Sequence, residues 1–138
     1  MKPVIQTQTG GTGNCFSACL ASILELPIEV VPNFFEVRLT DDPDGWWAAV
    51  REWLYLYGYG VLVIDDSNGN LSLSLPGFLI VSGTSPRERM HATIWEGGKL
   101  IHDPHPEGGG VRAPLDISLL YPLDPSRFNL TWRANSEH

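Results

Sequence analysis

The stretch GGTGNCFSACLASILELP, from Gly10 to Pro27, decides how the chain is interpreted. It opens on a Gly-rich loop and passes through Asn14, a residue type that favours helix N-caps. Apolar residues then recur at helical spacing until Pro27 stops the pattern. The spacing predicts a helix over residues 15–26. Its apolar stripe is expected to contain Phe16, Cys19, Leu20, Ile23, Leu24 and Leu26, and its polar side Ser17, Ser22 and Glu25.

Cys15 is expected at the start of this helix, where unpaired backbone N–H groups and the positive end of the helix dipole gather. Both favour a thiolate, which is the nucleophilic form of cysteine. The same N–H groups are suited to stabilise an oxyanion during attack on a carbonyl. A free cysteine is also often a small buried side chain, and position alone leaves both interpretations open. Cys19 lies one turn further, without these features, and is expected in the core.

The rest of the chain predicts an α+β domain over residues 1–138, with N-terminal helices packed on a C-terminal antiparallel sheet. Residues 32–44 are expected to be a loop with one helical turn, and residues 65–70 a turn-rich loop. A second helix is expected over residues 45–57, with a core stripe of Trp46, Val50, Trp53, Leu54 and Tyr57. Strands are expected at residues 61–64, 78–82, 91–95, 99–102, 119–123 and 128–132, the third and fourth forming a hairpin through Gly97 and Gly98.

His91 opens the first strand of that hairpin, and Asp103 follows on its partner strand. An imidazole at a strand mouth can reach a helix start packed on the sheet and accept a proton from the thiol there. A carboxylate beside the imidazole would fix its tautomer, the third role of a triad. Each residue alone has an ordinary structural explanation. The combination of Cys15, His91 and Asp103 in this order predicts a catalytic triad.

A zinc site is the alternative use of His91, His102, Asp103 and His105. Adjacent residues of a strand point to opposite faces, so His102 and Asp103 do not readily bind one ion. The prolines around His105 indicate a rigid turn. We therefore predict neither a metal nor another cofactor.

Charge and composition limit the partners and the compartment. The net charge is −7, and the nine basic residues are scattered, which argues against nucleic-acid binding. No run approaches the about 20 apolar residues that span a membrane, and the first residues lack the apolar core of a secretory signal. Two cysteines four residues apart do not suggest a disulfide framework. These features predict a cytoplasmic protein.

Taken together, these residues resemble the papain-like cysteine peptidase superfamily. The order is similar to that of the double-glycine-leader (C39-like) peptidases. It is more similar still to small, often phage-encoded papain-like proteins, which share a Gln-Thr pair, then Gly-Asn-Cys, then an Ala-rich helix that ends near a Val-Pro-x-Phe. Here these are Gln6–Thr7, Gly13–Cys15, Ala18–Leu24 and Val31–Phe34, followed by His91–Ala92 and His102–Pro106. The resemblance also implies an upstream glutamine as an oxyanion donor, with Gln6 favoured and Gln8 as the alternative.

The resemblance implies a cysteine-dependent amide hydrolase (a peptidase, isopeptidase or amidase) that forms a thioacyl-enzyme on a protein or peptide substrate. Substrate selection is expected from the loops at residues 32–44, 65–74 and 86–90. The alternative is a catalytically silent papain-like domain that binds, for example, as a phage-encoded inhibitor of a host protein. A reactive Cys15 favours the enzyme.

Overall fold

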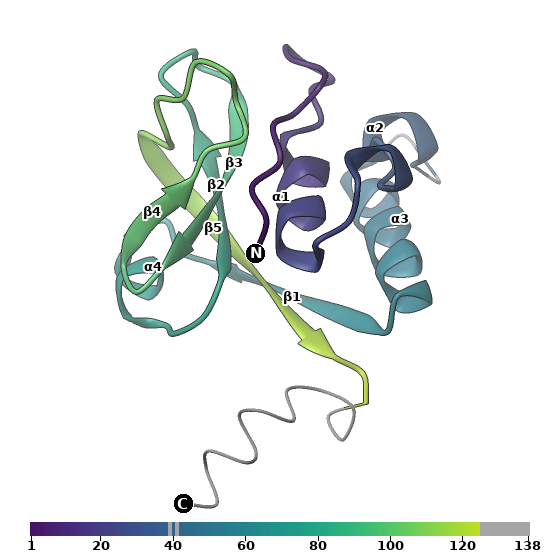
Figure 1. The fold of residues 1–138 in the computed structure, drawn as a ribbon. Helices are drawn as coiled ribbons and strands as arrows, with labels where there is room; N and C mark the ends of the chain where they lie inside the picture. The colour runs from purple at the N-terminus through teal and green to yellow at the C-terminus, as the bar shows by residue number, and fades with distance from the viewer. Residues whose placement is uncertain (39, 41, 125–138) are drawn as a thin grey trace, which may run out of the picture.

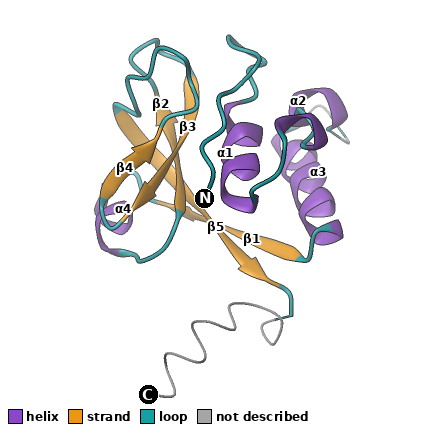
Figure 2. Cartoon of the chain, viewed as in Figure 1, coloured by secondary structure: helices purple, strands orange, loops and turns teal. Residues whose placement is uncertain are grey.

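The computed structural model describes residues 1–38, 40 and 42–124. Helices dominate the first half of this part and strands the second, as the secondary-structure view shows (Figure 2). The elements are α1 (Cys15–Leu24), η1 (Ile28–Val30), α2 (Phe34–Val37), α3 (Pro43–Leu56), β1 (Tyr59–Asp65), α4 (Asn70–Ser74), β2 (Leu79–Thr84), β3 (Met90–Glu96), β4 (Lys99–His102) and β5 (Ala113–Pro122). The predicted α+β class is confirmed.

The strands form one antiparallel sheet in the order β1-β5-β2-β3-β4. On one side of it, α1 packs against β3 and α3 against β1 (Figure 1). The core of this layer includes Phe16, Leu20, Phe34, Val50, Leu54, Val61, Ile80 and Ile94. A smaller core consists of Leu79 and Val81 of β2 and Ile117 of β5, and Leu71 of α4 packs against it. Helices packed on an antiparallel sheet were predicted, and the arrangement brings the start of α1 towards β3.

The α1 helix is buried on more sides than its sequence predicts. Ser17 and Ser22, expected on a polar face, are almost completely buried. The Ser17 hydroxyl donates to the Pro32 carbonyl at 2.6 Å. The Ser22 hydroxyl donates to the Ala18 carbonyl at 2.7 Å and accepts the Val4 N–H at 2.9 Å. Because each hydroxyl has backbone partners, the helix tolerates serine in the core.

No single helix in the described part of the chain is long and apolar enough to cross a membrane. Among the described residues, one pair of segments, Cys15–Leu24 and Ile28–Val37, has the necessary length and composition, and it is bent by 113°.

The α3 helix begins two residues earlier than predicted. Asp42 caps it by accepting a backbone N–H three residues on, and Pro43 occupies the first turn, where its missing N–H costs nothing. Val50 and Leu54 are fully buried, as predicted. Trp46 and Trp53 of the predicted stripe are only partly buried. Tyr57 is 42% exposed, so the prediction that it belongs to the core was wrong.

The predicted β3–β4 hairpin is confirmed, with its turn between Glu96 and Lys99. In contrast, β5 begins at Ala113, six residues before the predicted strand start at residue 119. Pro114 pairs with Gly83 of β2, whereas β1 pairs with β5 only from Asp116 onwards, so the proline lies where one side of the strand has no ladder to break. The strand predicted at residues 128–132 lies outside the described residues.

The α4 helix was not predicted, because residues 65–74 are rich in turn formers. The Asp66 carboxylate organises it by accepting the N–H groups of Leu71 and Ser72 at 2.8 and 3.0 Å. A polar segment thereby becomes a short helix that contributes Leu71 to the smaller core.

The N-terminal segment runs beside α1, between this helix and the residues that follow β4 (Figure 1). Lys2 N–H donates to the Ser22 carbonyl at 3.0 Å, and Gln6 N–H donates to the Pro104 carbonyl at 2.9 Å. His102 Nε2 lies 2.7 Å from the Val4 carbonyl oxygen. These contacts fix Gln6 near the start of α1.

Candidate active site

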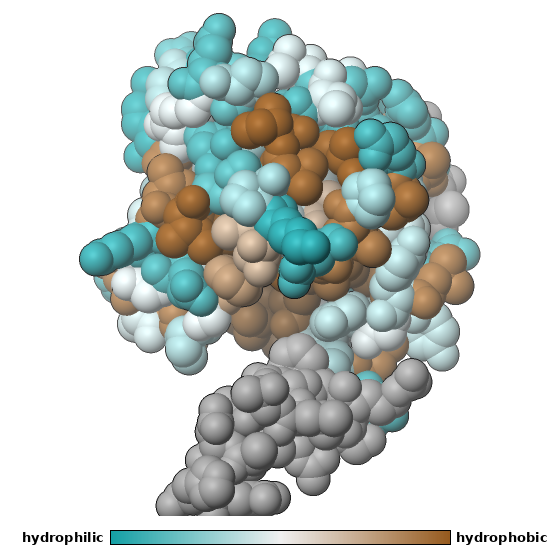
Figure 3. Space-filling view, in the orientation of Figure 1, coloured by the Kyte–Doolittle hydropathy of each residue, from teal (hydrophilic) through white to brown (hydrophobic). Residues whose placement is uncertain are grey.

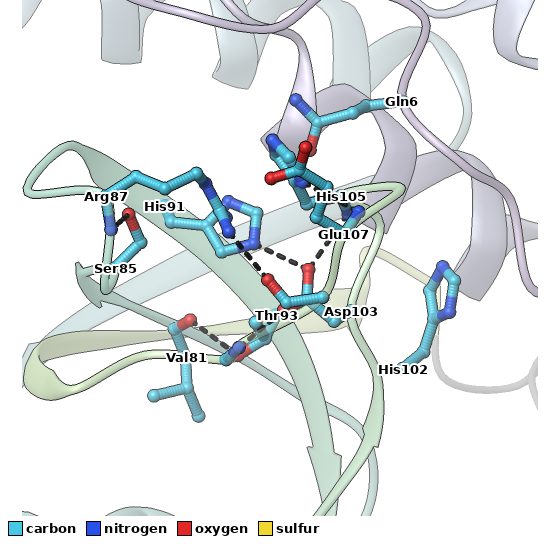
Figure 4. A network of polar contacts seen from close by, with 12 residues as sticks. Gln6, Val81, Ser85, Arg87, His91, Thr93, His102, Asp103, His105 and Glu107 are labelled. Carbon is cyan, nitrogen blue, oxygen red and sulfur yellow. Dashed lines mark hydrogen bonds and ion pairs between the residues drawn. The ribbon is translucent and has the colours of Figure 1, made fainter.

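His91 and Asp103 form a buried hydrogen-bonded pair. Nε2 of His91 lies 2.7 Å from Oδ1 of Asp103, and the two side chains are only 4% and 9% exposed. Figure 4 shows the ring turned towards the carboxylate, with His102 on another side. The hairpin brings the pair together, since His91 is the second residue of β3. Asp103 lies one residue beyond β4, and not on the strand as predicted. The direction of its side chain is therefore not set by the alternation of side chains between the two faces of the sheet.

The loop after β4 holds the Asp103 carboxylate in place. Oδ1 also accepts the His105 N–H at 2.9 Å, and Oδ2 accepts the Gly110 N–H at 2.7 Å. Burial acts to raise the pKa of Asp103, but these two N–H groups and His91 together lower it below its ordinary value. Asp103 is therefore ionised at neutral pH.

Burial lowers the pKa of His91, with Arg87 and His105 acting in the same direction and Asp103 opposing them. The imidazole is therefore neutral at pH 7. Since Asp103 is an acceptor, the ring places its proton on Nε2 and leaves a lone pair on Nδ1. Asp103 thus fixes the tautomer in which Nδ1 can accept a proton.

Cys15 begins α1 and lies beside the open start of β3. The β4 strand pairs with β3 only from Ile94 to Glu96, which leaves the start of β3 accessible to α1. The backbone N–H of Ala92, the residue after His91, interacts with the Cys15 thiol. The structure therefore brings Cys15 and His91 to one place, as the sequence predicts.

The thiol of Cys15 is not activated by its surroundings alone. Burial raises its pKa, and this effect exceeds the opposite effect of the N–H groups of Ala92, Phe16 and Cys15 itself. The expected thiolate is therefore wrong. The Cys15 thiol and the His91 imidazole, which line one cavity, are both neutral at pH 7. Cys19 is fully buried, as expected, and burial raises its pKa further. Both cysteines are free thiols.

Asn14 has a different role from the predicted helix cap. Its side chain makes no cap hydrogen bond to α1. Its Oδ1 accepts the N–H groups of Thr7 and Gln8 at 3.0 and 2.9 Å, and its Nδ2 donates to the Thr7 hydroxyl at 2.9 Å. Asn14 therefore holds residues 7 and 8, next to Gln6, in place by hydrogen bonds, and its side chain accepts no hydrogen bond from the first N–H groups of α1.

The structure separates the two candidate oxyanion glutamines. Gln6 is 6% exposed, and its Nε2 donates to the Gln8 carbonyl at 2.8 Å, which leaves a second N–H for a substrate. A Cβ at Gly13 would lie only 3.3 Å from this Nε2, so glycine permits the close approach. The Gln8 side chain instead accepts a hydrogen bond from Asn33 at 2.5 Å and lies on the surface. The geometry favours Gln6.

A cavity of about 940 Å³ connects these groups. Gln6, Cys15, His91 and Ala92 line it, together with an aromatic wall of Phe16, Phe34, Phe35, Trp46 and Trp47. The space-filling view shows hydrophobic side chains gathered over α1 and α2, with hydrophilic surface around them (Figure 3). This face can therefore bind a ligand that is partly apolar.

The loops around the cavity match the predicted specificity loops only in part. Residues 33–35 and 87–90 line it, within two of the predicted loops. Residues 65–74 do not; Asp66 folds their second half into α4, whose Leu71 packs with the smaller core. Sequence reasoning also missed Asp116, which lies in the cavity wall on β5. Its pairing with β2 is a long-range contact that no local motif indicates.

No group of three or more metal-ligating side chains with the geometry to hold an ion occurs in the part of the chain that the structure describes. His102 is directed to the Val4 carbonyl and does not join His91.

Comparison with known proteins gives no independent identity. No protein-family model matches the chain, and no curated protein is significantly similar to it.

Proposed function

We propose that the chain is a cysteine-dependent amide hydrolase of the papain-like type, acting on a protein or peptide. The observation that carries this proposal is the buried His91–Asp103 pair beside a cysteine at a helix start. Together these residues have the chemical roles of nucleophile, base and orienting carboxylate. Because both cysteines are free thiols, we also propose a reducing, cytoplasmic location.

The neutral resting pair determines the order of proton transfers. As the Cys15 sulfur attacks the substrate carbonyl, Nδ1 of His91 takes the thiol proton, and Asp103 stabilises the resulting imidazolium. The free N–H of Gln6 and the first backbone N–H groups of α1 are suited to stabilise the oxyanion. His91 then returns the proton to the departing amine, which leaves a thioester on Cys15. Water attacks this thioester with His91 as base, and the acid and the thiol are released.

Acylation by p-nitrophenyl acetate tests the proposal without knowledge of the substrate. We expect a burst of nitrophenolate and an acetyl group on Cys15, detected by mass spectrometry. Cys19→Ala should retain the burst, since that thiol is fully buried, and Cys15→Ala should lose it. A burst that persists in Cys15→Ala would contradict the proposal.

One observation favours a second candidate, a catalytically silent domain that binds a partner in the same cavity. The raised pKa of Cys15 means that the thiol lacks activation before a ligand arrives. This candidate predicts that wild type shows no burst and that Cys15 reacts with p-nitrophenyl acetate no faster in wild type than in His91→Ala.

A further inference from the structure

Asp116 is a carboxylate in the cavity wall that the proposed triad does not use. It lies on β5 opposite Ser82 of β2, and Ser82 lies opposite Ala92 of β3. Since neighbouring strands are about 4.8 Å apart, the backbones of Asp116 and Ala92 are about 10 Å apart. The N–H of Ala92 interacts with the Cys15 thiol. Asp116 is therefore within reach of a long side chain on a substrate held at Cys15.

The described residues give this carboxylate no counter-charge. Its Oδ1 is buried without a hydrogen-bond partner, and no ion pair to it exists among residues 1–38, 40 and 42–124. Burial, and then the like charge of Asp65, raise the pKa of Asp116. Two cations, Arg87 and Arg89, line the same cavity, but neither forms an ion pair with Asp116 in the part of the chain that the structure describes. Arg87 donates to the Gly108 carbonyl at 2.7 Å, and the Arg89 guanidinium lies beside Gly11. A ligand cation would relieve this unfavourable arrangement.

Glu88 provides an internal comparison, because it is an acidic residue that lines the same cavity. Its side chain is exposed, and its Oε1 lies 3.9 Å from Nη2 of Arg112. The acidic group at the surface therefore has a partner within the protein, whereas the carboxylate in the wall has none among the described residues.

The lining of the cavity fits the two parts of a basic side chain. Gln6 Oε1 and Trp46 Nε1 are also buried without hydrogen-bond partners, and both residues line this cavity. Phe16, Trp46 and Trp47 pack edge to face and form an apolar wall. Such a wall suits an aliphatic stem, and its rings attract a cation. The cavity thus combines an apolar lining with an unpaired negative charge.

We propose that Asp116 determines specificity by binding the cationic end of a lysine or arginine side chain of the substrate. This inference rests on the proposed function, since it places the substrate's reacting carbonyl at Cys15. It deepens that function by naming the substrate class, a peptide with a basic residue near the bond cleaved.

Two chloromethyl ketones test the inference on the full chain. N-acetyl-lysyl and N-acetyl-norleucyl chloromethyl ketone differ mainly by the ammonium group, and each loses chloride when the Cys15 sulfur bonds to its methylene carbon. The ratio of their second-order labelling rates, followed by mass spectrometry, measures the preference for a cation. We expect the wild-type ratio to favour lysine by about tenfold, as a partly buried ion pair supports. Asp116→Asn, which keeps the shape of the side chain, should bring the ratio close to one.

Glu88→Gln and Glu107→Gln are the matched controls, since each removes one negative charge from the cavity rim. Both should retain the wild-type preference for lysine. A wild-type ratio near one, or a preference that survives in Asp116→Asn, would overturn the inference and leave the proposed function intact. If neither ketone labels Cys15, the inference and the proposed function both fail. Charge reversal in Asp116→Lys should disfavour the lysyl ketone, which confirms the sign of the effect.

Discussion

Asp66, in the turn after β1, and Asp116, in the cavity wall, differ in the hydrogen bonds that their carboxylates receive. Asp66 is 1% exposed, and its two oxygens accept the N–H groups of Leu71 and Ser72. Asp116 is partly buried, and its Oδ1 has no hydrogen-bond partner. The two residues are neighbours in the fold, because Asp65, which precedes Asp66, pairs with Asp116 across β1 and β5. The local backbone, and not the residue type, makes the difference.

The comparison distinguishes carboxylates that hold the fold together from one that is available to a ligand. A buried charge with several hydrogen-bond donors stabilises the native state, whereas one without donors costs free energy. Asp103 has both properties, because two loop N–H groups hold it and His91 uses it. The predictions below change each carboxylate in turn.

The largest effect is expected at Asp66. Asp66→Ala removes the acceptor of two backbone N–H groups and leaves them buried, so the free energy of unfolding should fall by about 3 kcal/mol. Urea denaturation followed by circular dichroism measures this change. Asp66→Asn, which keeps one acceptor oxygen, should lose about half as much. An unchanged midpoint in Asp66→Ala would show that α4 does not depend on this carboxylate.

Asp103→Asn should lower the free energy of unfolding by about 2 kcal/mol, because the amide keeps only one of the two acceptor oxygens. Acylation of Cys15 should also become slower, since an amide does not stabilise the His91 imidazolium. Its rate should fall between those of wild type and His91→Ala. If Asp103→Asn acylates as fast as wild type, Asp103 only shapes the loop.

The stability of the wild type should fall in two stages as the pH is lowered. The pKa of His91 is below 6.5 in the folded state, so its stabilisation is complete above pH 6.5 and is lost as the pH falls through the folded value. The pKa of Asp103 is below 3.8, so its stabilisation is present above pH 3.8 and is lost at still lower pH. His91→Gln should remove the first stage only, as urea midpoints measured across the pH range will show.

The smallest effect has the opposite sign. Because the pKa of Asp116 is raised, its ionisation destabilises the fold as the pH rises through the folded value. Asp116→Asn should therefore gain about 0.5 kcal/mol of stability at pH 7, a small value because the side chain is partly solvated. Thermal unfolding at pH 7 measures the gain. A clear loss of stability would show that the carboxylate has a partner, and would weaken the contrast with Asp66.

The parts of the fold that could be predicted from sequence depend on local signals. The glycines after Glu96 fixed the hairpin, and Pro27 marked the end of α1 to within a few residues. The order of Cys15, His91 and Asp103 predicted three residues that the structure brings together. The glycines and Pro27 lie within a few residues of the elements that they predict, whereas the third signal is an order of residue types spread along the chain.

The features that sequence missed depend on contacts made at a distance. The first residues of β5, Pro114 included, are held by pairing with β2, a strand distant in sequence. The buried serines of α1 are satisfied by carbonyls and by the N-terminal segment. Asp116 faces the cavity only because β5 pairs with β2. The pKa of Cys15 could not be predicted either, because burial by the assembled fold exceeds the effect of the helix start.

The pH dependence of Cys15 acylation in wild type and His91→Ala tests the central claim most directly. With p-nitrophenyl acetate, the wild-type rate should rise to a plateau with a midpoint below pH 6.5, because neutral His91 removes the thiol proton. His91→Ala should be about 100-fold slower at pH 7 and should gain rate only as the pH approaches the raised pKa of the thiol. Superimposable profiles for the two proteins would contradict the account, since Cys15 would then react without a base.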